Sequence, residues 1–291
     1  MPRPHDQLRP VRVTRRFTSA PGSVLWQQGE TLVLCTAAVE GKRPKFFTDD
    51  RPGGWVTAEY VMHPASVSSG GGGGGRKDWP DSIRPDKRAT EIGRLIGRAV
   101  RAAVDLAKIG PHTITLDCTV LQADGGTRTA AICGAMVALS DALASLPAEM
   151  PVAGKGGRMK AEGGSAESAK APSPSGSSSF RPHPLSFHAD PLLPAFDPAY
   201  YDPRAALVNP LAAVSVGVVE GRVVLDLDYA LDSRAETDMN VVRTADGRYV
   251  ELQGNAESGG GFTPEQLAEM LRLANKGIDE LLRIQREALQ H

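Results

Sequence analysis

Alternating apolar and polar residues predict β-strands in both the N-terminal and the C-terminal part of this sequence. The segment 113–122 is the clearest, because apolar residues from Ile114 to Val120 alternate with threonine and aspartate, so that one face is apolar. Asp246-Gly247 adds a strong signal for a hairpin turn. The remaining strand-like segments are 11–16, 23–28, 31–38, 55–62, 212–219, 222–229, 240–243 and 248–252.

Apolar residues at intervals of three and four predict helices over 88–107, 129–146 and from Thr263 onward. Gly110-Pro111 follows the first of these and is typical of a helix end. In the last helix, Thr263 suits the N-cap position and Gln266 completes a capping box. Hairpins followed by helices, twice over, predict an α+β fold with helices packed on mixed sheets.

Two segments of unusual composition interrupt this pattern. Residues 66–85 contain six consecutive glycines and predict a glycine-rich loop, whereas 153–206 begins as a Gly, Ser, Ala and Pro-rich, low-complexity insertion. The later part of the insertion has enough aromatic residues to dock on a surface. We therefore expect a single domain over 1–291, with two similar halves.

Composition limits the class of protein. The chain has 291 residues, 41% of them hydrophobic, and a formal net charge of −1, which argues against a protein enveloped in nucleic acid but allows a local basic patch. Its three cysteines lie in apolar runs without metal-ligand spacing, which indicates buried free thiols. No apolar leader or membrane-length stretch is present, so we expect a cytoplasmic protein without a membrane partner.

The segment QADGGTRT, residues 122–129, joins a predicted strand to a predicted helix and is the strongest candidate site. Helix N-termini attract anions, and glycines at 125 and 126 let the backbone approach one closely. Thr127 adds a hydroxyl donor, and Arg128 can bind a phosphate through two parallel hydrogen bonds. The pattern alone leaves an ordinary strand-to-helix turn with a solvated arginine equally open.

The segment DSRAETD, residues 232–238, is a second candidate. It follows a predicted strand that carries Asp226 and Asp228, and its own Asp232 and Asp238 can bind a divalent ion or supply a proton. An acidic surface turn explains the same pattern, and by itself the pattern favours that reading. Arg88, at the start of its helix, is a third candidate, for which a solvated first-turn arginine is the simpler account.

In combination, these segments resemble the ribonuclease PH family. The resemblance covers nearly the whole chain outside the two interruptions and is carried by WVTAEYVM, EIGRLIGRAVRAAVDL, LQADGGTRTA and DSRAETDMNVV. It implies a fold of two βαβ-type units, like domains of small-subunit ribosomal proteins, and a hexameric ring built as a trimer of dimers. It also implies phosphorolysis at the 3′ ends of transfer RNA precursors, which releases nucleoside 5′-diphosphates.

The same resemblance assigns roles to the candidate residues. Inorganic phosphate, the co-substrate, would be bound by Arg88, Gly126, Thr127 and Arg128. Asp232 and Asp238 would be the catalytic pair, acting through Mg²⁺ or by proton transfer. Cationic residues of the glycine-rich loop would hold RNA, although this loop keeps only Arg76, Lys77 and Arg84 where relatives have more arginines.

A catalytically silent, exosome-like ring subunit that only binds RNA is the alternative function. Such subunits typically lose the phosphate-site arginine or the acidic pair, and this chain keeps both.

Overall fold

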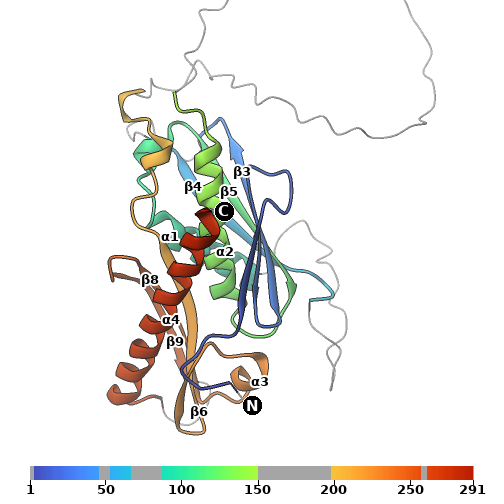
Figure 1. Ribbon diagram of the computed structural model, residues 1–291, viewed down its shortest axis with the longest axis vertical. Coiled ribbons are helices and arrows are strands. Elements are labelled where there is room, and N and C mark those ends of the chain that lie inside the picture. Colours follow the sequence, from blue (N-terminus) through green and yellow to red (C-terminus); the bar gives the residue numbers. More distant parts are fainter. Residues whose placement is uncertain (1–2, 46–52, 67–86, 150–197, 257–260, 291) are drawn as a thin grey trace, which may run out of the picture.

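The computed structural model describes residues 3–45, 53–66, 87–149, 198–256 and 261–290 (Figure 1). Within these ranges two β-sheets and the helices packed on them confirm the expected α+β class. The glycine-rich loop beyond Ser66 and the insertion up to residue 197 lie outside the described residues.

The first sheet contains five strands in the order β1-β2-β3-β5-β4. Neighbouring strands are antiparallel except β4 and β5, which run parallel, so the sheet is mixed. Helices α1 and α2 pack against it. The strands are β1 (Val11–Arg15), β2 (Gly22–Gln28), β3 (Thr31–Glu40), β4 (Trp55–Met62) and β5 (Thr113–Gln122); the helices are α1 (Lys87–Arg101) and α2 (Thr127–Ser145).

The second sheet contains four antiparallel strands in the order β7-β6-β8-β9. The long C-terminal helix α4 packs against β6, β7 and β8 and also contacts α2 and β1. Because α2 contacts both sheets, it lies at the centre of the molecule (Figure 1). The elements are β6 (Leu211–Val219), β7 (Arg222–Leu225), α3 (Tyr229–Asp232), β8 (Thr237–Thr244), β9 (Tyr249–Ala256) and α4 (Pro264–Gln290).

Local sequence signals explain how several elements begin and turn. Thr263 and Gln266 form the predicted capping box, with reciprocal hydrogen bonds of 2.9 and 3.2 Å between side chain and backbone. Gly247 has a φ of +92° in the turn between β8 and β9, which confirms the predicted hairpin. Helix α2 is buried along most of its length, as expected for a helix packed between two sheets.

The helix predicted over 88–107 is too long. Helix α1 ends at Arg101, and a short 3-10 helix, η1 (Leu106–Ile109), follows. The apolar spacing continues past Arg101 because Ala103 and Val104 are buried against residues near Leu207, with which Val104 forms a β-bridge. Ala103 and Val104 are therefore apolar because they pack against a segment about one hundred residues later in the chain, not because they belong to a helix.

The strand predicted over 222–229 is also too long. Strand β7 ends at Leu225, and Asp226 turns the chain with a φ of +57°. Asp228 then caps α3 by accepting a hydrogen bond from the Leu231 amide at 2.9 Å. Asp226 and Asp228 are therefore not on a strand, and they have different roles: Asp226 turns the chain, whereas Asp228 caps α3.

The end of the low-complexity insertion docks on the first half of the protein. The Tyr201 side chain is buried, and its hydroxyl donates to the Pro147 carbonyl at 2.9 Å. The Asp202 amide donates to the Lys108 carbonyl at 2.9 Å. These contacts agree with the docking role expected for its aromatic residues.

All three cysteines are buried and free, as predicted. Burial raises the pKa of Cys133 to about 12, which keeps it a neutral thiol. Among the described residues, none of the helices is both long enough and apolar enough to cross a membrane.

Candidate active site

The loop from Asp124 to Gly126 connects β5 to α2 and exposes the N-terminus of that helix. Gly125 and Gly126 have φ values of +71° and +62°, and Gly126 is the N-cap residue of α2. No side chain caps the helix there, so the N–H groups of its first turn are available to an external acceptor. Thr127 and Arg128 form this turn, so the geometry agrees with an anion site.

Gly125→Ala should destabilise the protein more than Gly126→Ala. Both replacements require a left-handed backbone, which costs roughly 1–2 kcal/mol. A Cβ at 125 would also lie 2.5 Å from the Leu227 carbonyl oxygen and 2.8 Å from the Asp228 carbonyl carbon. At 126 the nearest atom is the end of the Arg9 side chain, at 3.0 Å. Denaturant unfolding of the two variants checks the order; equal losses would contradict it.

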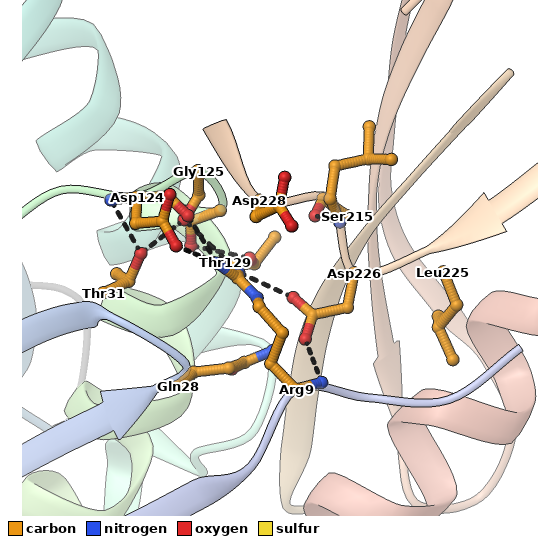
Figure 2. A network of polar contacts seen from close by, with 12 residues as sticks. Arg9, Gln28, Thr31, Asp124, Gly125, Thr129, Ser215, Leu225, Asp226 and Asp228 are labelled. Carbon is orange, nitrogen blue, oxygen red and sulfur yellow. Dashed lines mark hydrogen bonds and ion pairs between the residues drawn. The ribbon is translucent and has the colours of Figure 1, made fainter. Parts of the chain in front are cut away.

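In the view of Figure 2, Arg9 lies below the loop from Asp124 to Gly126, which is called the glycine loop, and bonds to it. Its guanidinium donates to the carbonyls of Asp124 and Gly125, and Thr31 bonds to the same two residues. The Thr31 hydroxyl donates to the Gly125 carbonyl at 2.7 Å and accepts from the Asp124 amide at 3.0 Å. These contacts fix the backbone just before the N-terminus of α2.

The same arginine connects the loop to the second half of the protein. Arg9 Nη2 lies 2.8 Å from Asp226 Oδ1, and the Arg9 amide donates to Asp226 Oδ2, also at 2.8 Å (Figure 2). Both side chains are almost fully buried, with 7% and 1% exposed. A buried pair of this kind makes several hydrogen bonds because unpaired charges would be costly there. Sequence reasoning missed the pair, since its members lie 217 residues apart.

Tyr60, a buried residue of β4, interacts with three of the predicted phosphate ligands. The Tyr60 hydroxyl donates to Thr127 Oγ1 at 2.9 Å. Burial raises the pKa of Tyr60, while the hydrogen bond with Thr127 and the positive charges of Arg128 and Arg88 act in the opposite direction. Arg88, in the first turn of α1, and Arg128, in the first turn of α2, thus act electrostatically on the same hydroxyl. Sequence reasoning missed Tyr60, whose only signal was its place in the strand-like run WVTAEYVM.

The second sheet contributes a polar row that faces this helix end. Opposed residues of antiparallel strands share a face, and the register pairs Ser215 with Asn240 and Asn240 with Gln253. Ser215 lies against Gly126, and Gln253 accepts a hydrogen bond from Arg128 at 3.3 Å. Asp238 is two residues from Asn240 in β8, so it belongs to the same face.

Asp232 is the last residue of α3 and is exposed, whereas Asp238, in β8, is partly buried. Helix α3 begins against the glycine loop, because the Tyr229 amide donates to Asp124 Oδ1 at 3.1 Å and Gly125 lies close to Asp228. The structure therefore brings the segment that carries the acidic pair to the same side of the molecule as the phosphate-site candidates.

Asp232 and Asp238 carry the type of ligand that magnesium prefers. In the described ranges, no group of three or more His, Cys, Asp or Glu side chains could form a closed metal site. Magnesium is often bound through one or two carboxylates and substrate phosphates, a donor set that Asp232 and Asp238 match. Arg76, Lys77 and Arg84, the predicted RNA contacts, lie outside the described residues.

Comparison with known proteins agrees with this fold. The model of the 3′ exoribonuclease family, domain 1, matches residues 7–144, and that of domain 2 matches residues 209–277. The chain belongs to the 3′ exoribonuclease family.

Curated relatives and solved structures extend this match over nearly the whole chain. Ribonuclease PH of Rhodopirellula baltica is 44% identical over 288 residues, covering 99% of this chain and 96% of the relative. Ribonuclease PH of Corynebacterium kroppenstedtii is 42% identical over 285 residues, covering 98% and 90%. These matches confirm the predicted enzyme class, a 3′ exoribonuclease.

Two structural neighbours share the fold at low identity. Rice (Oryza sativa) Rrp46 aligns with a TM-score of 0.63 and 18% identity, covering 99% of this chain and 98% of the neighbour. The Archaeoglobus fulgidus exosome with RNA bound to the active site aligns with a TM-score of 0.62 and 19% identity, covering 97% and 90%. They confirm the predicted ribonuclease PH type of fold.

Proposed function

We propose that this protein shortens RNA from its 3′ end by phosphorolysis, with inorganic phosphate as the attacking group. The observation that carries the proposal is the uncapped N-terminus of α2, where Thr127 is bonded to Tyr60 and Arg128 to Gln253, and where Arg88 and Arg128 both act electrostatically on Tyr60. Two guanidinium groups, a hydroxyl and free backbone N–H groups form a site for a small, doubly charged anion. A hydrolytic nuclease would need no such pocket.

Phosphate held at this site would attack the last phosphodiester. One of its oxygens forms a bond to the terminal phosphorus, and the bond from that phosphorus to the 3′ oxygen of the preceding nucleotide breaks. The products are a nucleoside 5′-diphosphate and an RNA shorter by one nucleotide, whose new 3′ oxygen takes up a proton. The arginines align the nucleophile and offset the charge on the phosphoryl oxygens.

Asp232 and Asp238 serve the leaving-group side of the reaction. A bound Mg²⁺ would supply charge stabilisation at the reacting phosphodiester, and these two carboxylates would hold it. Without a metal role, the same pair would deliver the proton to the leaving 3′ oxygen. The polar row on the second sheet supports this assignment, since Asp238 shares its face with residues that contact Gly126 and Arg128.

RNA would reach the site beside the glycine-rich loop. The Ala123 amide donates to the Ser66 carbonyl at 2.8 Å, and the described chain resumes at Lys87, directly before Arg88. The residues that flank the 67–86 segment therefore lie at the phosphate site, which supports RNA-binding roles for Arg76, Lys77 and Arg84. We propose 3′-extended transfer RNA precursors as the substrates, a hexameric ring as the assembly and the cytoplasm as the location, in line with the curated relatives named Ribonuclease PH.

A catalytically silent ring subunit is less well supported than an active enzyme. Such a subunit has no need of an organised phosphate site, whereas here Thr127 is bonded to Tyr60 and Arg128 to Gln253. The acidic residues Asp232 and Asp238 are both present.

Product analysis tests the proposed function. A 3′-extended transfer RNA incubated with the protein, Mg²⁺ and inorganic phosphate should yield nucleoside 5′-diphosphates, and omission of phosphate should stop the release. Arg128→Ala tests the phosphate site itself and should raise the KM for phosphate. Release of nucleoside monophosphates without added phosphate would show hydrolysis and overturn the proposal.

A further inference from the structure

Gln253, on β9, contacts the arginine that begins α2. Its side-chain oxygen Oε1 accepts a hydrogen bond from Arg128 Nη1 at 3.3 Å. The two residues lie 125 positions apart and belong to different halves of the protein, and both line the same surface pocket between α1 and β9. The guanidinium is thus oriented from the second sheet, not from its own helix.

The neighbouring position on the same strand makes a chemically different contact. Glu251, two residues earlier on the same face of β9, lies 3.3 Å from Arg98 Nη2 of α1. There a carboxylate meets a guanidinium, and the charges cancel. At position 253 an amide meets a guanidinium, so the contact fixes geometry and leaves the full positive charge of Arg128 in place.

This difference suits an arginine that binds phosphate. Guanidinium has five N–H donors in a rigid fork and binds an oxyanion best through two parallel hydrogen bonds. A neutral acceptor that occupies one donor limits the rotation of the fork without competing electrostatically with the incoming anion. A carboxylate at the same place would form an ion pair with the arginine, and phosphate would have to displace it.

We propose that Gln253 is a positioning residue for phosphate, which orients Arg128 through a neutral hydrogen bond and thereby sets the affinity for the attacking anion. The proposal rests on the phosphate-binding role of Arg128 under the proposed function.

Three substitutions test it: Gln253→Glu, Gln253→Ala and, as the matched control on the same strand, Glu251→Gln. The KM for inorganic phosphate, kcat and the thermal midpoint are measured for each full-length protein. Gln253→Glu should raise the KM for phosphate by about tenfold or more, corresponding to the usual strength of a hydrogen bond to a charged group. Gln253→Ala should raise it by a smaller factor, and Glu251→Gln should leave it within about twofold, the scale of an exposed ion pair.

The order of the variants separates positioning from structural support. Glutamate has the shape of glutamine and can still bond to Arg128, so a purely structural residue would tolerate it better than alanine. We expect the reverse order for the KM for phosphate, with an unchanged or higher thermal midpoint in Gln253→Glu. The proposal would be overturned if Glu251→Gln raised the KM for phosphate as much as Gln253→Glu does, or if Gln253→Glu raised it less than Gln253→Ala.

Arg128→Ala distinguishes the two levels of inference. If it raises the KM for phosphate while Gln253→Glu does not, the positioning role is wrong and the phosphate site stands. If Arg128→Ala leaves that KM unchanged, the assignment of Arg128 fails and the role of Gln253 fails with it.

Discussion

Asp238→Asn should lower kcat by about a thousandfold, since loss of a proton donor or of a charge that stabilises the transition state has effects of this order. Asparagine keeps the shape of aspartate but loses its charge and its proton. Asp238 lies within β8, paired with Gly217 and Asn255, so the backbone ladder does not depend on its carboxylate. Initial rates of nucleoside diphosphate release at saturating phosphate measure the effect.

Glu236→Gln is the matched control for this variant. It removes the same charge two residues away, and the amide oxygen of the new side chain would still accept the hydrogen bond that Glu236 takes from the Gly221 amide at 3.0 Å. We expect its kcat to stay within about twofold of the parent, as for most changes at exposed charged groups. Light scattering should give the mass of six chains for all three proteins. Asp238→Asn with near-parental kcat would show that the acidic pair is not where the chemistry occurs.

Arg9→Met should lower the free energy of unfolding by roughly 3–5 kcal/mol, the range observed when one member of a buried ion pair is removed. Asp226 would remain buried without its cation, and the carbonyls of Asp124 and Gly125 would lose their donor. Because the protein is proposed to be oligomeric, denaturant unfolding should be compared at one fixed protein concentration.

A double-mutant cycle identifies the source of that loss. Asp226→Asn alone should also destabilise, since Arg9 would then be the unpaired charge, whereas Arg9→Met combined with Asp226→Asn should recover much of the loss. Asparagine tolerates the left-handed backbone at 226, and its amide oxygen can still accept from the Arg9 amide. Arg15→Met provides a comparison, because Arg15 pairs with Asp141 at a partly exposed position. If the Arg9 and Asp226 effects simply add, the two residues act independently and the pair is not the link between the halves.

Local patterns predicted the elements of this fold because the relevant signals are short in sequence. The capping box at Thr263 and the turn at Gly247 each involve neighbours within a few residues. The end of α1 was predicted too late because burial of Ala103 and Val104 depends on residues near Leu207. Apolar spacing records that a residue is buried, but it does not record which segment buries it.

The candidate site was predicted in part for the same reason. The glycine loop and the first turn of α2 form one continuous segment, so their geometry could be inferred from residues 122–129 alone. Tyr60, Gln253 and the Arg9–Asp226 pair act on that segment from other strands. Nothing in the sequence distinguishes Arg9 from the other arginines near the N-terminus, and only the fold shows that it is buried.

The docking of the two halves through Arg9, Asp226 and the polar row has a consequence for thermodynamic linkage. A ligand that binds only when the two halves are in contact raises the free energy of unfolding by mass action. The increase is about 2.7 kcal/mol at a ligand concentration one hundred times its Kd. Inorganic phosphate would then be a chemical chaperone of its own enzyme as well as a co-substrate. Phosphate starvation would lower turnover and, at the same time, loosen the contact between the halves.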